Sequence, residues 1–171
     1  MIKINLYGGP NCGKSTIAAA VFVELKARLI NCELVREFAK ELVYKGVDMR
    51  LLDEGSRLCL LAEQLQRETI LKGKVDYLIT DSPMLLTSYY HNKNYAKVIA
   101  LNTLNKEDFH FWLPRTNQKY EQSGRSHNLD ESLKIDEEMK KYIIDCSVNL
   151  IEVPGSIKER TDKIIKLVLS N

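Results

Sequence analysis

The sequence predicts an α/β protein in which a mostly parallel, five-stranded sheet is covered by helices on both faces. Short apolar segments alternate with longer helix-like segments along the chain, and the first apolar segment ends at a glycine-rich loop. Parallel strands need long crossover connections, and the helix-like segments supply them. The predicted architecture is therefore a three-layer sandwich formed by one domain over residues 1–171.

Composition supports a globular protein and excludes several other classes. The 171 residues include 25 Lys and Arg against 23 Asp and Glu, a net charge of +2, and 44% of them are hydrophobic. This balance disfavours disordered and fibrous chains, and also a dedicated nucleic-acid coat or a polybasic membrane binder. The longest apolar run is seven residues, at 17–23, far below the roughly 18 of a membrane span, and the first residues lack a secretory segment. We expect a soluble, cytoplasmic protein.

Four cysteines are scattered along the chain without a CxxC pair. This spacing predicts neither a zinc site nor a disulfide framework, and reduced thiols are the expected state. The cysteines are Cys12, Cys32, Cys59 and Cys146.

Five segments have the apolar or alternating pattern of strands, and each stops at a turn-forming or polar residue. They cover residues 2–7, 32–35, 75–80, 109–113 and 148–153. The first strand runs into Gly8-Gly9-Pro10, and the third ends at Asp81-Ser82-Pro83. Pro83 suits the first turn of the next helix, where its missing N–H would be unpaired anyway.

Helices are predicted between and after these strands. Their expected ranges are a helix from about residue 14, then 36–44, 54–72, a helix after Pro83, 95–104, 129–146 and 156–169. The first lacks Gly and Pro over residues 17–25 and is apolar around much of its circumference. Lys45-Gly46 breaks the second, Gly73 ends the third, and Asn128 with Glu131 resembles a capping box before the sixth.

The loop after the first strand has the spacing GxxxxGK[ST]. Small residues there let backbone N–H groups surround a phosphate, and the following helix directs its positive end at the same point. Lys14 would reach the β- and γ-phosphates, and the Ser15 hydroxyl would ligate Mg²⁺. The predicted nucleotide-binding residues are Gly8, Gly9, Pro10, Asn11, Cys12, Gly13, Lys14, Ser15 and Thr16.

These residues resemble the Walker A loop of the P-loop NTPases. In open α/β sheets ligands bind at the edge formed by the carboxyl ends of the strands. The residues at the other strand ends therefore indicate which branch of the P-loop NTPases the chain resembles. Asp81 follows the third strand at the position of a Walker B acid. It is predicted to hold Mg²⁺ with Ser15 or to act on the acceptor, and capping the next helix is a compatible role.

Asn105-Lys106-Glu107-Asp108 matches the NKxD guanine-reading motif of GTPases, but its context disfavours that function. The motif precedes the strand at 109–113, whereas in GTPases it follows a buried strand. Asp81-Ser82-Pro83-Met84 also lacks the glycine of the GTPase switch. The chain length suits the nucleoside and nucleoside-monophosphate kinase branch instead.

Residues 114–128 are almost free of apolar side chains and predominantly basic. They lie between the fourth strand and the next helix, where the kinases that this chain resembles carry a mobile lid. The resemblance implies that Arg115 and Arg125 neutralise the transferring phosphoryl group and that the lid excludes water. A solvated surface loop is the alternative.

The acceptor site is expected at the second strand and the third helix. The resemblance implies that Arg36 holds a phosphate or sugar and that Glu37 is the base, although an ordinary helix start remains an alternative. The helix over residues 54–72 has an apolar stripe of Leu58, Leu61 and Leu65, with Gln64 at its margin. In nucleoside kinases a Gln on the corresponding helix reads the base edge, so Gln64, with Arg57 and Arg67, is the predicted substrate pocket; a solvated surface Gln is the alternative.

The sequence thus resembles small P-loop kinases that include nicotinamide riboside kinase-like domains and deoxynucleoside and deoxynucleotide kinases. The resemblance implies ATP- and Mg²⁺-dependent phosphoryl transfer to a nucleoside, nucleotide or related small-molecule acceptor, with a nucleic-acid acceptor as a variant. Lys14, Arg115 and Arg125 would stabilise the transition state, and Glu37 or Asp81 would accept the proton. Many such kinases have Asp-Arg where this chain has Asp81-Ser82. The missing Arg leaves open which residue binds the phosphate or sugar of the acceptor. A nucleotide-dependent regulatory ATPase or GTPase module is the alternative.

Overall fold

The structure is a computed structural model that describes residues 1–115 and 129–170, the side chains of residues 129–132 excepted. Five parallel strands form one sheet in the order β2-β3-β1-β4-β5. The strands are β1 (Ile2–Tyr7), β2 (Cys32–Val35), β3 (Tyr77–Thr80), β4 (Phe109–Trp112) and β5 (Leu150–Glu152). The predicted parallel sheet and α/β fold class are confirmed, and the strands predicted at residues 75–80, 109–113 and 148–153 are shorter than expected.

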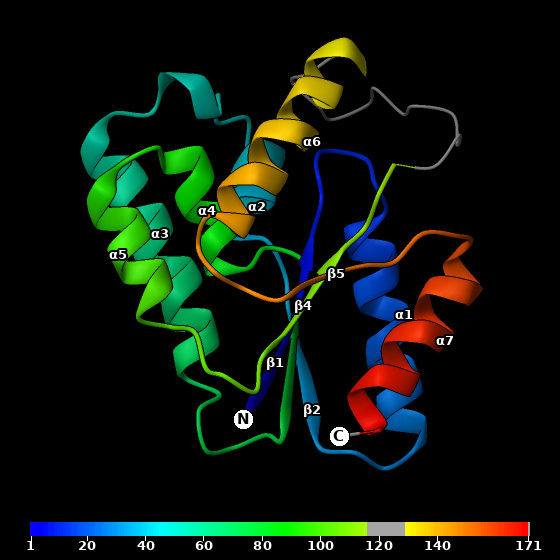
Figure 1. Cartoon of the computed structure of the whole chain (residues 1–171). Helices are drawn as coiled ribbons and strands as arrows, with labels where there is room; N and C mark the ends of the chain where they lie inside the picture. The colour runs from blue at the N-terminus through cyan, green and yellow to red at the C-terminus, as the bar shows by residue number, and fades with distance from the viewer. Residues whose placement is uncertain (116–128, 171) are drawn as a thin grey trace.

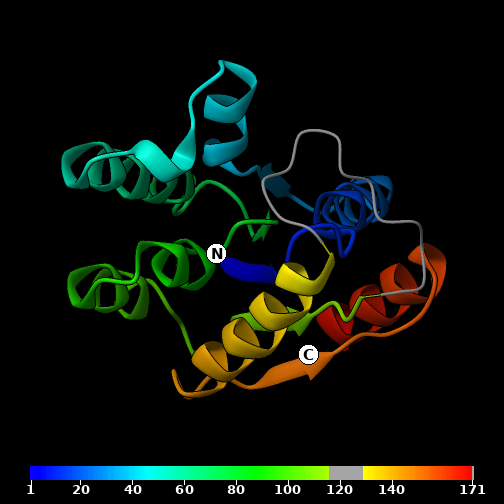
Figure 2. The same cartoon turned by 90° about the horizontal axis from the view of Figure 1, so that it is seen from above.

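Helices cover both faces of the sheet, as Figures 1 and 2 show. The helices are α1 (Lys14–Ala27), α2 (Phe38–Tyr44), α3 (Glu54–Thr69), α4 (Met84–His91), α5 (Asn94–Leu101), α6 (Leu129–Ile144) and α7 (Ile157–Leu169), with a 3₁₀ turn η1 (Met49–Leu51). Helices α1 and α7 pack together on one face, while α3, α4, α5 and α6 lie on the other. No helix within the described residues has the length and apolar character needed to cross a membrane.

The alternation of side chains along β1 divides the core into two parts. Ile4 and Leu6 point to the α1 and α7 face, where they pack with apolar residues of both helices. Tyr7 belongs to the other face and packs with residues of α3, α4 and α6. Both faces of β1 are buried, so β1 is held at the centre of the molecule and its carboxyl end has a fixed position.

Local sequence signals explain where several helices begin. Asp53 caps α3 by accepting a hydrogen bond from the Ser56 N–H, and Ser156 with Glu159 forms a capping box at α7. Pro83 immediately precedes α4, one position earlier than the predicted first turn. The capping box expected at Asn128 and Glu131 lies outside the described side chains, and the predicted lid at 114–128 lies outside the described residues from residue 116 onward.

The predicted stripe on α3 is wrong in one respect. Leu58 is 47% exposed, whereas the buried residues of α3 are Leu60, Leu61, Gln64 and Glu68. The helix is therefore rotated so that Gln64, at 1% exposure, lies within the buried face rather than at its margin. Two polar side chains, Gln64 and Glu68, are separated by one turn and both face the interior.

Candidate functional site

The glycine-rich loop connects the carboxyl end of β1 to the first turn of α1. Gly13 precedes the helix with a φ of 86°, a left-handed conformation that glycine adopts without strain, and supplies no side-chain cap. Gly8 has a φ of 144°, and an added Cβ there would lie 2.4 Å from Cys12 Sγ and 2.8 Å from the Leu113 carbonyl oxygen. The first N–H groups of α1 have no partner within the helix, so the loop directs uncapped donors to one point.

Side chains bind the carbonyl groups of this loop. Lys14 Nζ donates hydrogen bonds to the carbonyl oxygens of Gly8 at 2.8 Å and Gly9 at 2.9 Å, and Cys12 Sγ donates to the Gly9 oxygen at 3.0 Å. Because these contacts engage the C=O groups, the peptide N–H groups are left for an anion. The Lys14 ammonium lies at the centre of the loop, where the motif predicts a phosphate ligand.

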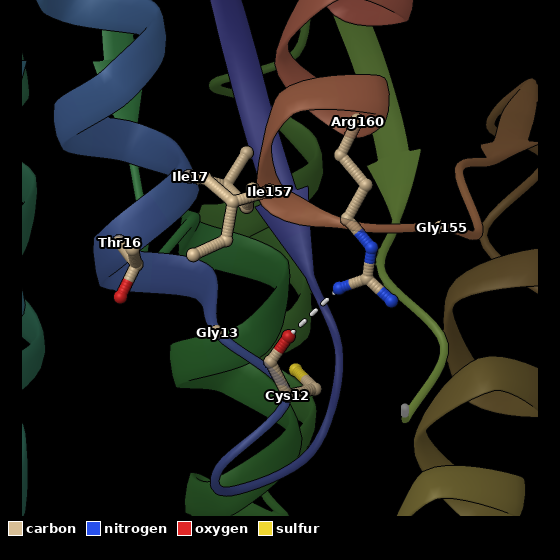
Figure 3. Close-up of a pocket in the computed structure, with 7 residues that line it drawn as sticks. All are labelled: Cys12, Gly13, Thr16, Ile17, Gly155, Ile157 and Arg160. Carbon is tan, nitrogen blue, oxygen red and sulfur yellow. Dashed lines mark hydrogen bonds between the residues drawn. The ribbon is translucent and has the colours of Figure 1, made fainter. Parts of the chain in front are cut away.

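Two arginines from elsewhere in the chain hold the same loop. Arg115 Nη1 donates to the Pro10 oxygen at 2.7 Å, and Arg160 Nη1 on α7 donates to the Cys12 oxygen at 3.0 Å. Figure 3 shows the Arg160 guanidinium reaching Cys12 beside Gly13 and Gly155. The sequence predicted Arg115 as a site residue but not Arg160. The only indication of Arg160 in the sequence is a positively charged residue on the otherwise apolar side of an amphipathic helix.

Asp81 and Glu37 meet at the carboxyl edge of β2 and β3. The N–H of Glu37 donates to Asp81 Oδ1 at 3.1 Å, and Asp81 is 4% exposed. β3 pairs with both β2 and β1, which places Asp81 at the strand end next to the one that carries the phosphate loop. The structure thus brings together two residues that the sequence assigned to the same reaction, while Arg36 is exposed.

Gln64 lies next to this pair. Its Oε1 accepts a hydrogen bond from the Phe38 N–H at 3.0 Å, and its buried Nε2 has no hydrogen-bond partner within the described residues. Buried amide groups are normally paired, so an unpaired NH₂ group marks a position where a ligand or water would satisfy it. The alternative of a solvated surface Gln is wrong.

The other two predicted pocket residues make contacts within the protein. Arg67 binds Glu41 and Glu63 and lies 4.6 Å from the centre of the Phe38 ring, which fastens α2 to α3. Arg57 Nε donates to the Leu52 oxygen at 3.1 Å and thereby holds the turn before α3. Both guanidinium groups are thus bound to groups of the protein itself.

Asp136 of α6 is a site residue that sequence reasoning missed. Its carboxylate accepts hydrogen bonds from Arg115 Nε at 3.0 Å and Nη2 at 3.2 Å. Tyr90 of α4 was also missed: its side chain is 44% exposed, and the protein atoms around its hydroxyl, together with the charges of Glu37 and Asp136, raise the pKa of that hydroxyl well above the ordinary range. No sequence motif marks either residue, because their proximity to the loop depends on how α4 and α6 pack.

The NKxD-like segment lies at the opposite edge of the sheet. Asp108 accepts hydrogen bonds from the Lys3 N–H at 3.0 Å and the Asn105 N–H at 2.9 Å, and Lys3 is near the amino end of β1. The phosphate loop follows the carboxyl end of the same strand. Asp108 therefore closes a turn at the sheet edge away from the phosphate loop, a position that favours the prediction that this segment does not read guanine.

The donor groups fit a magnesium ion that is held mainly by phosphates and water. Asp81 and the exposed Ser15 carry oxygen atoms, the ligand type that Mg²⁺ prefers, and would hold the ion beside the phosphates at the loop. Within the described residues no group of three or more His, Cys, Asp or Glu side chains is placed to hold a metal. Mg²⁺ commonly uses one or two protein ligands with nucleotide phosphates, so this small set is sufficient.

A phosphate loop between β1 and α1, with an acid at the end of the neighbouring strand, defines a P-loop NTPase. The chain belongs to the AAA domain family, which matches residues 3–160. The resemblance to P-loop NTPases that the sequence indicated is therefore confirmed. No curated protein matches the chain.

Two solved structures share the fold. One is deoxyadenosine kinase from M. mycoides with the products dCMP and a flexible dCDP bound, at 14% identity and a TM-score of 0.62, covering 99% of this chain and 100% of that one. The other is described as APE1195, at 17% identity and a TM-score of 0.56, covering 99% and 95%. The chain is thus a P-loop nucleotide-binding domain with a deoxynucleoside kinase-like fold.

Proposed function

We propose that this protein is an ATP-dependent kinase that transfers a phosphoryl group to a nucleoside or nucleotide acceptor. The observation that carries the proposal is the hydrogen bond from the Glu37 backbone N–H to the Asp81 carboxylate, at the strand ends beside the phosphate loop. A nucleotide-binding loop alone suits many P-loop proteins, but an acidic residue at each of two neighbouring strand ends suits proton transfer from a hydroxyl acceptor. The kinase-like fold supports the same choice.

Each residue has a distinct role in this proposal. Residues 8–16 hold the donor phosphates, and Lys14 and Arg115 neutralise charge that develops during transfer, with Arg125 outside the described residues. Ser15 and Asp81 would hold Mg²⁺, which neutralises the donor phosphates when bound. Glu37 or Asp81 accepts the proton of the acceptor hydroxyl, and Gln64 binds the acceptor through its unpaired Nε2.

Arg36, Arg57 and Arg67 remain candidates for the acceptor side. Arg67 is bound to Glu41 and Glu63, so an acceptor phosphate would have to compete with two carboxylates. Arg36 is exposed at the end of β2, one residue before Glu37. These positions make Arg36 the simpler ligand for a phosphate or sugar.

The test is phosphoryl transfer with a panel of acceptors. The protein, Mg²⁺ and either ATP or GTP are incubated with nucleosides, nucleoside monophosphates, nicotinamide riboside and DNA oligonucleotides, and products are identified by mass. Acceptor-dependent gain of one phosphoryl group is expected, and it would name the acceptor class. Tight nucleotide binding with slow, acceptor-independent hydrolysis would instead support a regulatory module.

Lys14→Ala is the variant expected to lose phosphoryl transfer. Removal of the ammonium group should abolish transfer while the circular dichroism spectrum stays unchanged, because the hydrogen bonds of the Lys14 amine within the described residues go to loop carbonyls. Lys26→Ala, an exposed lysine on the same helix, is the control. Normal turnover by Lys14→Ala would refute the assignment.

A further inference from the structure

The Arg115 guanidinium lies between α6 and the phosphate loop. Two of its nitrogens bind the Asp136 carboxylate at 3.0 and 3.2 Å, and the third binds the Pro10 oxygen at 2.7 Å. The side chains of Arg115 and Asp136 are only 13% and 16% exposed, so water screens the pair weakly. One ion pair therefore connects a helix from late in the chain to the loop after β1.

Asp136 also lies against the loop itself. A Cβ added at Gly9 would be 1.7 Å from Asp136 Oδ1, which means that the carboxylate rests on the backbone of a loop residue. Negative charge at this position repels a nucleotide phosphate, and the repulsion is strong where water is excluded. Arg115 offsets this charge only while it stays paired with Asp136.

A nucleotide phosphate and Asp136 compete for the same group. A guanidinium presents two parallel N–H donors along its Nε/Nη2 edge, and in Arg115 this edge is occupied by the Asp136 carboxylate. A phosphate that binds the same edge competes with Asp136 for these two donors. Binding of a donor nucleotide through this edge therefore costs part of the Arg115–Asp136 interaction.

We propose that Asp136 is a positioning residue that holds Arg115 on the phosphate loop in the nucleotide-free protein and releases it to the donor phosphates. The proposal rests on the donor site of the proposed function, and not on which acceptor is phosphorylated. According to this proposal, Asp136 lowers the affinity of the protein for nucleotide. If Asp136 only stabilised the position of α6 against the loop, its presence would raise that affinity instead.

The experiment measures ATP affinity of the full chain by isothermal titration calorimetry with Mg²⁺. Asp136→Asn is expected to bind ATP about five-fold more tightly than the wild type, because the neutral amide holds Arg115 less strongly and repels phosphate less. Glu138→Gln, two residues along the same helix, is the control and should bind ATP as the wild type does. Unchanged or weaker binding by Asp136→Asn would overturn the proposal.

A second measurement uses the wild-type protein and does not depend on folding of a variant. The side-chain Nε–H resonance of Arg115, observed by ¹⁵N NMR, should shift when ATP is added, as the guanidinium exchanges Asp136 for phosphate. A resonance that stays unchanged at saturating ATP would refute the exchange. If the wild-type protein binds no ATP, the donor site fails and the proposal with it; if it binds ATP but transfers nothing, only the kinase assignment fails.

Discussion

Arg160 of α7 donates a hydrogen bond to the carbonyl oxygen of Cys12 at 3.0 Å, across a sequence separation of 148 residues. The same guanidinium donates to the Pro114 oxygen, so it connects the phosphate loop to the residue that precedes Arg115. The side chain is 3% exposed, its Nε has no hydrogen-bond partner within the described residues, and burial lowers its pKa. A buried cation with two carbonyl partners fixes the shape of the loop that would bind phosphate.

Arg160→Lys tests this arrangement. A single ammonium on a flexible stem cannot reproduce two directed guanidinium bonds, so the loop should lose part of its order. We expect ATP affinity to fall about ten-fold and the free energy of unfolding to fall by about 2 kcal/mol. Calorimetry and urea unfolding measure the two effects, with Arg28→Lys, an exposed residue of the same type, as the control. Wild-type ATP affinity in Arg160→Lys would contradict the role.

Gln64→Met separates acceptor binding from donor binding. Methionine has a similar length but cannot accept the Phe38 N–H or donate from Nε2. We expect the acceptor KM to rise about ten-fold while the dissociation constant of ATP stays unchanged. Gln66→Met, at an exposed position of the same helix, is the control. If Gln64→Met lowers stability but leaves the acceptor KM unchanged, Gln64 serves only to orient α2.

A buried ion pair joins Lys3 of β1 to Glu68 of α3, with the two charged atoms 3.1 Å apart and the side chains 7% and 3% exposed. Burial raises the pKa of Glu68 even though Lys3 opposes the shift. Glu68→Ala leaves the Lys3 cation buried without its partner, and we expect the free energy of unfolding to fall by about 3–5 kcal/mol. Urea unfolding checks this value.

The exposed pair of Lys158 and Asp162 provides the comparison, because its side chains are 83% and 60% exposed. Asp162→Ala should leave the unfolding midpoint unchanged, since water and salt screen this pair. Equal losses of unfolding free energy in Glu68→Ala and Asp162→Ala would show that burial does not determine how much an ion pair contributes to stability.

The sequence predicts the sheet and the phosphate loop because both depend on local patterns. Alternating apolar residues mark the strands, and Gly8, Gly13 and Lys14 have a spacing that few other structures require. The position of Asp81 follows from the same logic, since the ends of parallel strands meet at one edge, whereas the role of Glu37 is implied by the resemblance to small P-loop kinases.

The remaining site residues depend on packing that no local pattern encodes. Asp136 reaches Gly9 because α6 lies beside the loop, and Arg160 reaches Cys12 because α7 packs against α1 (Figure 1). Gln64 illustrates the same limit, because a rotation of α3 by less than a turn decides whether its amide is buried or solvated. Apolar periodicity locates the face of a helix only approximately when polar residues belong to that face.

Acidification should destabilise the protein through His110. This residue of β4 is 5% exposed, its Nδ1 lies 3.0 Å from the Tyr7 hydroxyl, and burial lowers its pKa from 6.5 to about 4. The unfolded chain protonates this imidazole as the pH falls below 6.5, whereas the folded chain does not until about pH 4. The unfolded state therefore binds more protons in this interval, and stability declines as the pH falls through it.

The size of the effect follows from the pKa difference. At about 1.4 kcal/mol per unit, the loss between neutral pH and pH 4 is at most about 3 kcal/mol. Urea unfolding at several pH values is compared with His110→Phe, which keeps an aromatic ring beside Tyr7 but cannot titrate. The variant will be less stable at neutral pH, because Tyr7 loses its partner, but its stability should fall less steeply on acidification. Exposed carboxylates such as Asp48 titrate in both proteins, so the difference between the two profiles isolates His110, and parallel profiles would refute the prediction.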